Sequence, residues 1–451
     1  MRDLDYKSLS SEIITRNNFL YEENREAWNR AIQKYPKAIC YPKTAKEVIE
    51  ALKFVKENKI KFRIRSGRHH YEGYSTGNDI FIIDVSKMNN IYVDEDNKTV
   101  KIDGGVRNRE LYEALNSLGY PFPGGGCPTV GVIGFTLGGG WGYSSRLLGL
   151  GCDNLIEAEL VNCDGDLLTL NNDVNKDLLW ALKGSGGGNF GIVTSMTFKL
   201  PNKIEMATLI NIDFNNIDIE EKIDIIEELQ NTYKTLDRRM NLKTAIYNSQ
   251  EKGHGIKMTG LFYGKKEEAN KILQSIKSKG SKMYYNLEYM TVLDANRWIQ
   301  DSHPDYEKYK SGGRFVLRDY NREEIKKIIE VVSQRAEGST YTAVSFYGLG
   351  GAVSDIEKNN TAFYYRNAKF IMGFQSVWED LKYAEINVNW VKERFEFIKS
   401  ITEGSFINFP IDSLDDYEKE YYGKNIVKLK EVKIKYDSNN IFNFEQSIKG
   451  I

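Results

Sequence analysis

Two glycine-rich stretches decide the fold of this chain: RSGRHHYEG at residues 65–73 and GGGCPTVGV at residues 124–132. The first carries the imidazole of His69 and the second the thiol of Cys127. Both groups are nucleophiles, and glycine lets the backbone around them turn sharply and approach a ligand closely. The pair therefore suits two covalent attachments to one cofactor. The plainer alternatives are a histidine on a surface loop and a small buried thiol.

Helical and extended segments alternate around these loops. Residues 44–58 repeat apolar side chains at helical spacing after a threonine cap, and residues 61–65 alternate as a strand that leads into the His69 loop. A second helix is expected from about Asn108, a plausible N-cap, and another over 413–435. Further strands are expected at 81–85, 100–103, 155–161, 192–200 and 342–347.

Composition excludes several classes of partner. The chain has 451 residues, which suggests two or three domains or one large two-lobed fold; 41% of them are hydrophobic and 28% charged, an ordinary profile for an enzyme. Lys+Arg total 62 against 63 for Asp+Glu, so no net field favours nucleic acid or an anionic membrane. No apolar run is long enough to span a membrane, and the four cysteines lack zinc-site spacing, so no metal is expected. The polar N-terminus does not resemble a signal peptide, which predicts a cytoplasmic protein. We expect three of the cysteines to be buried: Cys40, Cys152 and Cys163.

The two glycine-rich loops resemble those of the berberine-bridge-enzyme-like flavin oxidases, in the vanillyl-alcohol-oxidase superfamily. In that family a histidine bonds the flavin 8α-methyl group and a cysteine bonds ring carbon C6. The resemblance therefore implies FAD that is covalently attached through His69 and Cys127. The segment YDSNNIF at residues 436–442 resembles the family's C-terminal signature, which packs back on the cofactor domain.

The same resemblance implies an α+β fold in two lobes. Residues 1–202 and 404–451 are expected to form a PCMH-type FAD-binding domain. Residues 203–403 are expected to form a substrate-binding domain, with an antiparallel sheet flanked by helices. The flavin ring is then expected between the lobes, where clefts usually hold ligands.

The cofactor-binding residues are expected in several glycine-rich segments. Successive N–H groups in the turn at Ser66 and Gly67 form a concave anion site suited to a pyrophosphate. Arg68 stands where the family usually has glycine, so its side chain either pairs with the phosphates or crowds the loop. The segment GGGNFG at 186–191 matches a dinucleotide-binding pattern, but a helix precedes it and a strand follows, the reverse of a Rossmann site. The full set is Arg65, Ser66, Gly67, Arg68, His69, His70, Cys127, Val130, Gly131, Gly134, Gly138, Gly139, Gly142, Asp153, Gly188, Asn189, Gly191, Val193 and Asn408.

Two further positions bear on the reaction. Val130 lies three residues after Cys127, where in the family a small side chain accompanies oxygen access and oxidase activity; ordinary strand packing is the alternative. Trp141 follows three glycines, at a position where the family commonly has tyrosine on the substrate side of the flavin. Its indole N–H donates a hydrogen bond but cannot act as a base. Trp141 therefore either stacks on a sugar or aromatic substrate or fills the core.

The residue that accepts the proton has no single candidate in the sequence. Family members commonly carry Tyr-x-Asn-Tyr near the C-terminus, whereas residues 406–409 read FINF, which retains Asn408 and lacks both phenols. A ring without an O–H group neither accepts nor relays a proton. A second family base position, five residues before Trp378, holds Gly373; Gln375 shares its strand face, but an amide is no base. Candidate replacements are Tyr347, Tyr364, Tyr365 and Glu403. The expected catalytic set is Trp141, Tyr347, Tyr365, Gln375 and Asn408.

Three functions are compatible with these residues. The first is an FAD-dependent oxidase that transfers a hydride from an alcohol or sugar hemiacetal carbon to flavin N5, with O2 reoxidising the flavin to give H2O2. The second is a secondary-metabolite tailoring flavoenzyme that oxidises a C–H or C–N bond without a tyrosine base. The third is a flavin-binding scaffold with little turnover. The expected partners are a small-molecule substrate and O2, for a monomer or homodimer that binds neither nucleic acid nor a membrane.

Overall fold

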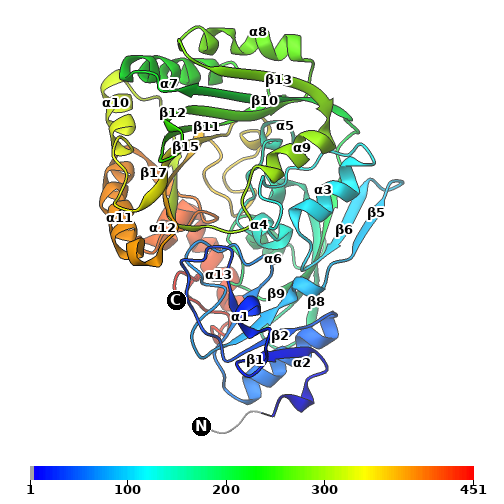
Figure 1. Ribbon diagram of the computed structural model, residues 1–451. Coiled ribbons are helices and arrows are strands. Elements are labelled where there is room, and N and C mark those ends of the chain that lie inside the picture. The colour runs from blue at the N-terminus through cyan, green and yellow to red at the C-terminus, as the bar shows by residue number, and fades with distance from the viewer. Residues whose placement is uncertain (1–4, 451) are drawn as a thin grey trace.

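Three β-sheets organise residues 5–450, the range that the computed structural model describes. Sheets of four and five strands form within the first 200 residues, and later strands form an eight-stranded sheet (Figure 1). Residues 1–4 and residue 451 lie outside the described range. The polar N-terminal segment, for which no signal peptide is expected, therefore falls partly outside it. No helix within that range is both long and apolar enough to cross a membrane.

The four-stranded sheet carries the His69 loop. Helix α2 (Ala45–Glu57) connects strand β2 (Ala38–Tyr41) to strand β3 (Phe62–Arg65). Both strands pair in parallel with β4 (Phe81–Asp84), which lies between them in the sheet. The predicted threonine cap is confirmed, because the Thr44 hydroxyl accepts a hydrogen bond from the Glu47 amide at 3.2 Å. The predicted strand before the loop is confirmed as β3, and the His69 loop starts where it ends. The strand order is β1 (Glu12–Thr15), β2 (Ala38–Tyr41), β4 (Phe81–Asp84) and β3 (Phe62–Arg65).

The five-stranded sheet is antiparallel. The Cys127 loop lies in the connection between two of its strands, β6 (Thr99–Asp103) and β7 (Leu155–Val161). The predicted cap at Asn108 is wrong: α3 (Asn108–Asn116) has Arg107 as its N-cap, whose backbone N–H donates to the Glu110 carboxylate at 2.9 Å. The Asn108 side chain instead donates to the Cys127 carbonyl at 3.1 Å, so it braces the next loop. The strand order is β5 (Ile91–Asp94), β6 (Thr99–Asp103), β9 (Ile192–Lys199), β7 (Leu155–Val161) and β8 (Leu167–Leu170).

The glycine cluster at residues 186–191 connects a helix to a strand. Helix α6 (Lys176–Leu182) precedes it and β9 follows it. This order confirms that the cluster is not a Rossmann turn, which needs a strand first and a helix second.

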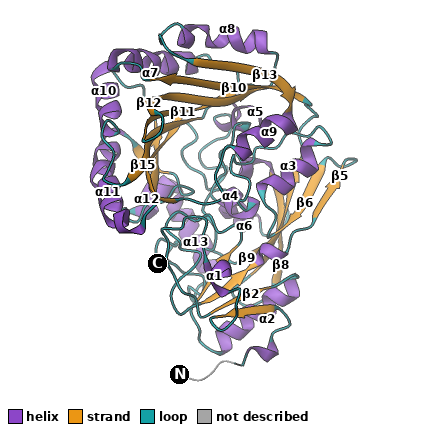
Figure 2. Ribbon diagram, viewed as in Figure 1, coloured by secondary structure: helices purple, strands orange, loops and turns teal. Residues whose placement is uncertain are grey.

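The eight-stranded sheet is antiparallel throughout and is flanked by helices, as expected. Helices α7 (Ile219–Tyr233), α8 (Lys266–Lys277), α10 (Arg322–Val331) and α11 (Ala384–Ile401) lie along its outer side, away from the glycine loops (Figure 2). The strand order is β13 (Tyr284–Thr291), β10 (Met206–Asn215), β12 (Gly253–Phe262), β11 (Met240–Ser249), β15 (Ser339–Gly348), β16 (Phe370–Trp378), β14 (Lys308–Val316) and β17 (Glu403–Ser405).

The C-terminal segment returns to the N-terminal sheets (Figure 1). The single helix predicted over 413–435 is wrong, because α12 (Tyr417–Tyr422) and α13 (Ile426–Tyr436) are separated by a turn at Gly423, where φ is +51°. Buried Lys433 on α13 holds this segment in place. Its ammonium donates to the Asn189 carbonyl at 2.7 Å, to the Phe442 carbonyl at 2.6 Å and to the Asp437 carboxylate at 2.7 Å.

Candidate active site

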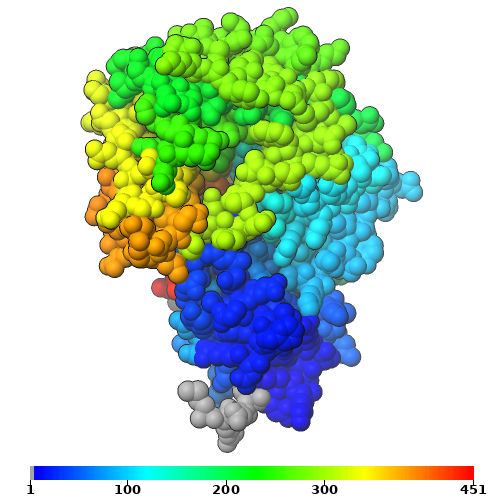
Figure 3. Space-filling view, in the orientation of Figure 1, coloured from blue at the N-terminus to red at the C-terminus, as the bar shows by residue number. Residues whose placement is uncertain are grey.

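A cavity of about 760 Å³ lies between the glycine-rich loops and the eight-stranded sheet. The loops that hold His69, Cys127 and Gly187 line one side of it. Alternate residues of β11, β12, β15 and β16 line the other side, because side chains two apart on a strand face the same way. Figure 3 shows one face of the molecule, where the blue and cyan N-terminal segments meet the green, yellow and orange middle of the chain. A volume of this size is ordinary for a cofactor or substrate site.

The His69 loop and the Cys127 loop are packed together backbone to backbone. A Cβ atom added to Gly67 would lie 2.1 Å from the backbone nitrogen of Gly131, and one added to Gly131 would lie 2.6 Å from Ser66 Oγ. The Ser66 hydroxyl donates to the Gly104 carbonyl at 2.8 Å. Buried Arg65 pairs with Asp84 at 2.5 Å and fixes the start of the loop. The two loops therefore behave as one unit.

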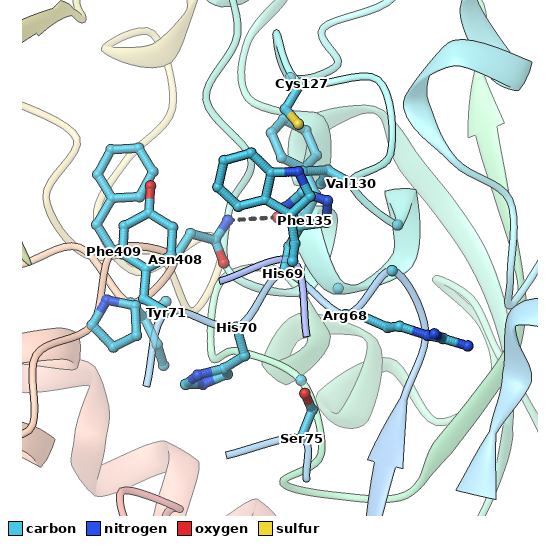
Figure 4. Close-up of a pocket in the computed structure, with 18 of the residues that line it drawn as sticks. Arg68, His69, His70, Tyr71, Ser75, Cys127, Val130, Phe135, Asn408 and Phe409 are labelled. Carbon is cyan, nitrogen blue, oxygen red and sulfur yellow. Dashed lines mark hydrogen bonds between the residues drawn. The ribbon is translucent and has the colours of Figure 1, made fainter. Parts of the chain in front are cut away.

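Arg68 has its guanidinium anchored to the protein at the cavity wall. Its backbone is left-handed, with φ +63°, a conformation that glycine adopts without strain. Its Nη2 donates to the Tyr41 hydroxyl at 2.7 Å, and its Nε lies 3.7 Å from the Asp84 carboxylate. In Figure 4 its side chain extends away from Cys127. The structure therefore gives the Arg68 side chain partners within the protein.

His69 and His70 have different roles in the loop. Nε2 of His69 is 2.8 Å from the Thr129 hydroxyl, so Thr129 contacts this ring nitrogen and not Nδ1. The Trp28 ring stacks on the imidazole, with the ring centres 5.1 Å apart. Burial, with smaller contributions from Arg107 and His303, lowers the pKa of His69 to about 3, so the ring is neutral and nucleophilic at physiological pH. Nδ1 of His70 accepts from the backbone N–H groups of Glu72 and Tyr74, which turns that ring into its own loop.

Thr129 lies between the two proposed attachment points. Its hydroxyl contacts His69 at 2.8 Å and lies 3.9 Å from the Cys127 sulfur. Burial raises the pKa of the Cys127 thiol, which is half-buried at the cavity wall. The prediction that the other three cysteines are buried is confirmed. The sequence motif contains Thr129, but only the structure places it against both side chains.

The residues present fit a flavin dinucleotide. The joined loops offer backbone at Ser66 and Gly67, a neutral imidazole and a thiol along one continuous wall. Gly134 on α4 (Val132–Leu137) also lines the cavity, and a Cβ added there would meet no atom within 4 Å. Glycine at this position therefore leaves open space in the cavity rather than permitting a turn.

Filling that space should exclude the cofactor without disturbing the fold. We expect Gly134→Leu to purify with an unchanged or slightly higher unfolding midpoint, because leucine is a better helix former than glycine by up to about 1 kcal/mol. Its flavin-to-protein absorbance ratio should fall close to zero. Gly134→Ala, the matched control, should retain most of its flavin. Full flavin content in Gly134→Leu would show that the cofactor does not occupy this part of the cavity.

The structure places most of the predicted catalytic residues on the cavity wall. Trp141 is buried, and its indole N–H donates to the Gly348 carbonyl at 2.7 Å. The Tyr347 ring packs at 4.9 Å from Trp141 and covers Gly373, where an added Cβ would lie 2.9 Å from that ring. Asn408 donates to the Phe135 carbonyl at 2.8 Å, shown as the dashed line in Figure 4. Gln375 lines the sheet side.

Several predicted residues lie away from the cavity wall. Tyr365 stacks on Phe315 at 4.4 Å, and Asp153 forms a buried pair with Arg366 at 2.7 Å. The Asn189 side chain binds the Ser185 carbonyl at 3.0 Å. Tyr364 and Glu403 also lie outside the cavity lining. Three glycines pack tightly against protein atoms instead: Gly138 against Asn408, Gly139 against Phe363 and Gly142 against Gly124.

The cavity also contains titratable side chains to which the sequence assigned no role. Lys243 on β11 stands directly opposite Tyr347 on β15, with its ammonium 5.1 Å from the centre of that ring. Tyr71 stacks on Phe409 at 5.2 Å, with the two rings nearly parallel. Glu307 and His303 reach the cavity from the loop before β14. Lys243, Glu307 and His303 lie outside any recognisable motif, and Tyr71 lies within the first glycine-rich stretch without a role assigned to it, so spacing alone does not identify them.

Comparisons with known proteins agree with this site. A family profile described as an FAD binding domain matches residues 36–171, and one described as berberine and berberine like matches residues 405–449. The uncharacterized FAD-linked oxidoreductase YgaK of Bacillus subtilis is 32% identical over 450 residues, 99% of this chain and 98% of its own. Reticuline oxidase of Eschscholzia californica is 26% identical over 479 residues, 96% of this chain and 87% of its own.

Solved structures share the whole fold. BBE-like 1 of Physcomitrella patens superposes with a TM-score of 0.89 at 24% identity, over 98% of this chain and 97% of that one. Chitooligosaccharide oxidase superposes with a TM-score of 0.88 at 22% identity, over 98% and 97% of the two chains. These two similarities support the two-lobed α+β fold.

Proposed function

Because this chain belongs to the berberine-bridge-enzyme-like family of FAD-linked oxidoreductases, we propose that it is an oxidase with FAD covalently attached through His69 and Cys127. The observation that carries this proposal is the contact of Thr129 with both side chains at one cavity wall. A neutral imidazole and a thiol held this close suit two bonds to one planar ring.

The proposed substrate is an alcohol or a sugar hemiacetal. FAD, when bound, supplies the acceptor for the hydride that leaves the substrate carbon, and O2 then takes the electrons and becomes H2O2. The protein holds the substrate between Tyr347 and Gln375 on the sheet side and the two loops on the other. The small side chain of Val130 at the cavity wall supports access of oxygen. Sugar and alkaloid oxidases among the similar proteins support this reaction type.

The intact mass of the acid-denatured protein tests the covalent attachment. We expect a gain of one FAD, and peptide mapping should find it on the peptides with His69 and Cys127. Cys127→Ser and His69→Ala should each leave one bond, and the double variant should release all its flavin on denaturation. His70→Ala is the matched control and should keep the full mass gain, because its ring is turned into its own loop. A wild-type mass equal to the bare chain would contradict covalent attachment.

A second function is favoured by one specific observation. Phe406 and Phe409 stand where phenols are common, and their rings pack against each other at 5.0 Å. An enzyme that oxidises a C–H or C–N bond needs no phenolic base in this place, so a secondary-metabolite tailoring reaction is the alternative. Rapid anaerobic bleaching of the flavin by simple sugars would count against this alternative.

A further inference from the structure

Glu307 is a carboxyl group on the cavity wall with no partner in an ion pair within the described range. It lies in the loop between α9 (Val292–Asp301) and β14, and its side chain is half-buried. An isolated carboxylate is costly to bury, so such a group commonly has a chemical role rather than a structural one.

The backbone of Glu307 is fixed to the same short segment that supports His69. The Arg30 amide donates to the Glu307 carbonyl at 2.7 Å, and the Glu307 amide donates to the Trp28 carbonyl at 3.4 Å. Trp28 in turn stacks on His69, and its amide donates to the Arg68 carbonyl at 3.0 Å. This chain of contacts holds the carboxyl at a set position relative to the proposed attachment points.

Charged and titratable groups face Glu307 from every element around it. Burial raises the pKa of Glu307 to about 7; the Lys243 ammonium opposes this shift and the Glu379 carboxylate adds to it. Glu307 also contributes, after burial, to raising the pKa of Cys127 and of Tyr71, which places its charge near both. The facing groups are Lys243 on β11, Tyr341 on β15, Glu379 after β16, Tyr309 on β14, His303 in the same loop, and Tyr71 and Cys127 in the glycine-rich loops.

We propose that Glu307 is the catalytic proton acceptor, in place of the tyrosines that this chain lacks at 406 and 409; the proposal rests on the oxidase function above. The substrate O–H bond breaks and its proton goes to the Glu307 carboxylate. The adjacent C–H bond breaks with its electron pair, for which FAD, when bound, would be the hydride acceptor, and the C–O bond becomes a carbonyl. Lys243 keeps the acceptor available by favouring its ionised form. O2 removes the two electrons, and two protons leave with them as H2O2.

The other cavity residues serve this role less well. Burial raises the pKa of Tyr71 well above its ordinary value, so its phenol holds its proton at physiological pH. The amide of Gln375 cannot accept a proton. Burial lowers the pKa of His303 to about 4, and its Nδ1 lies 2.9 Å from the Ile299 carbonyl, which ties the ring to the preceding helix α9. A carboxylate that is half-protonated near neutral pH is better matched to general-base catalysis.

Glu307→Gln tests the assignment in the flavin-loaded protein, with cellobiose and a benzylic alcohol as probes. In anaerobic stopped-flow, the wild-type rate of flavin bleaching should rise with pH through about 7. Glu307→Gln should bleach about 10²–10⁴ times more slowly and lose that pH dependence. Asp305→Asn is the matched control, since it removes a carboxylate charge from an exposed position of the same loop outside the cavity lining and should bleach close to the wild-type rate.

A second readout needs no substrate. The folded-state pKa of Glu307 lies above its ordinary value, so wild-type stability is lost relative to Glu307→Gln as the pH rises from 4.5 to about 7, and the loss levels off above that. The gap between the two Tm values should therefore widen over that range; a constant gap would show a solvated carboxylate and overturn the assignment. If the probes bleach the flavin of Glu307→Gln as fast as that of the wild type, the assignment of Glu307 is overturned and the oxidase function is not. A wild-type flavin that neither probe bleaches contradicts the oxidase function and, with it, the assignment.

Discussion

Gly67→Ala is expected to purify without flavin. The added methyl carbon would lie 2.1 Å from the Gly131 nitrogen and 2.8 Å from its Cα, and these are backbone atoms that cannot move aside as a side chain can. The two loops must separate, which takes Thr129 away from His69 and opens the wall on which both attachment points lie. Overpacking of this kind also costs about 1–3 kcal/mol of the free energy of unfolding.

The measurement is the intact mass together with the thermal unfolding midpoint. Gly134→Ala is the matched control, because it adds the same methyl group to the same cavity wall where no atom lies within 4 Å. Gly67→Ala protein that carries a full FAD on both peptides would contradict the view that contact between the loops forms the site.

Arg366→Met should destabilise the protein by about 3–5 kcal/mol, because it leaves the Asp153 carboxylate buried without its partner. The guanidinium is 2% exposed and binds Asp153 through two nitrogens at 2.7 and 2.8 Å. It also donates to the Thr361 hydroxyl at 2.6 Å. We expect the folded fraction of this variant to keep its FAD, since neither charged residue lines the cavity.

Chemical denaturation at fixed pH measures this cost. The matched control is Lys435→Met, which breaks the exposed pair with Asp177 at 2.7 Å and should cost at most about 1 kcal/mol. Adding Asp153→Asn to Arg366→Met should recover part of the loss, because it removes the unpaired charge. Loss of FAD from otherwise folded Arg366→Met protein would instead support the original prediction that Asp153 takes part in cofactor binding.

Local sequence patterns predicted several elements well, and the two residues proposed as attachment points lie on one cavity wall. The Thr44 cap and the strand before His69 depend on neighbours a few residues away, and the structure confirms both. His69 and Cys127 were identifiable because few residue types form bonds to a flavin and both lie in glycine-rich loops. The glycines after residue 137 illustrate the limit: their density correctly indicated close approach, but the neighbours at Gly138 and Gly142 are protein atoms.

The proton acceptor could not be predicted from the sequence for a physical reason. Glu307 reaches the cavity because its backbone pairs with residues 28–30. In the same contact the Asn29 side chain donates to the carbonyl of Tyr309, which is 280 residues away in the sequence. Its role depends on burial and on the charge of Lys243 on another strand. Neither is visible in the local sequence DYEKY at 305–309.

The anchor formed by Lys433 bears on how the enzyme matures in a cell. The glycine loop at Asn189 is synthesised well before the ammonium that holds it, because Lys433 lies 244 residues further along the chain. Asn408, which braces Phe135 beside the cavity, also emerges late. A nascent chain of the first two hundred residues therefore lacks a finished pocket, and we expect it to hold FAD only after the segments with Asn408 and Lys433 have been made.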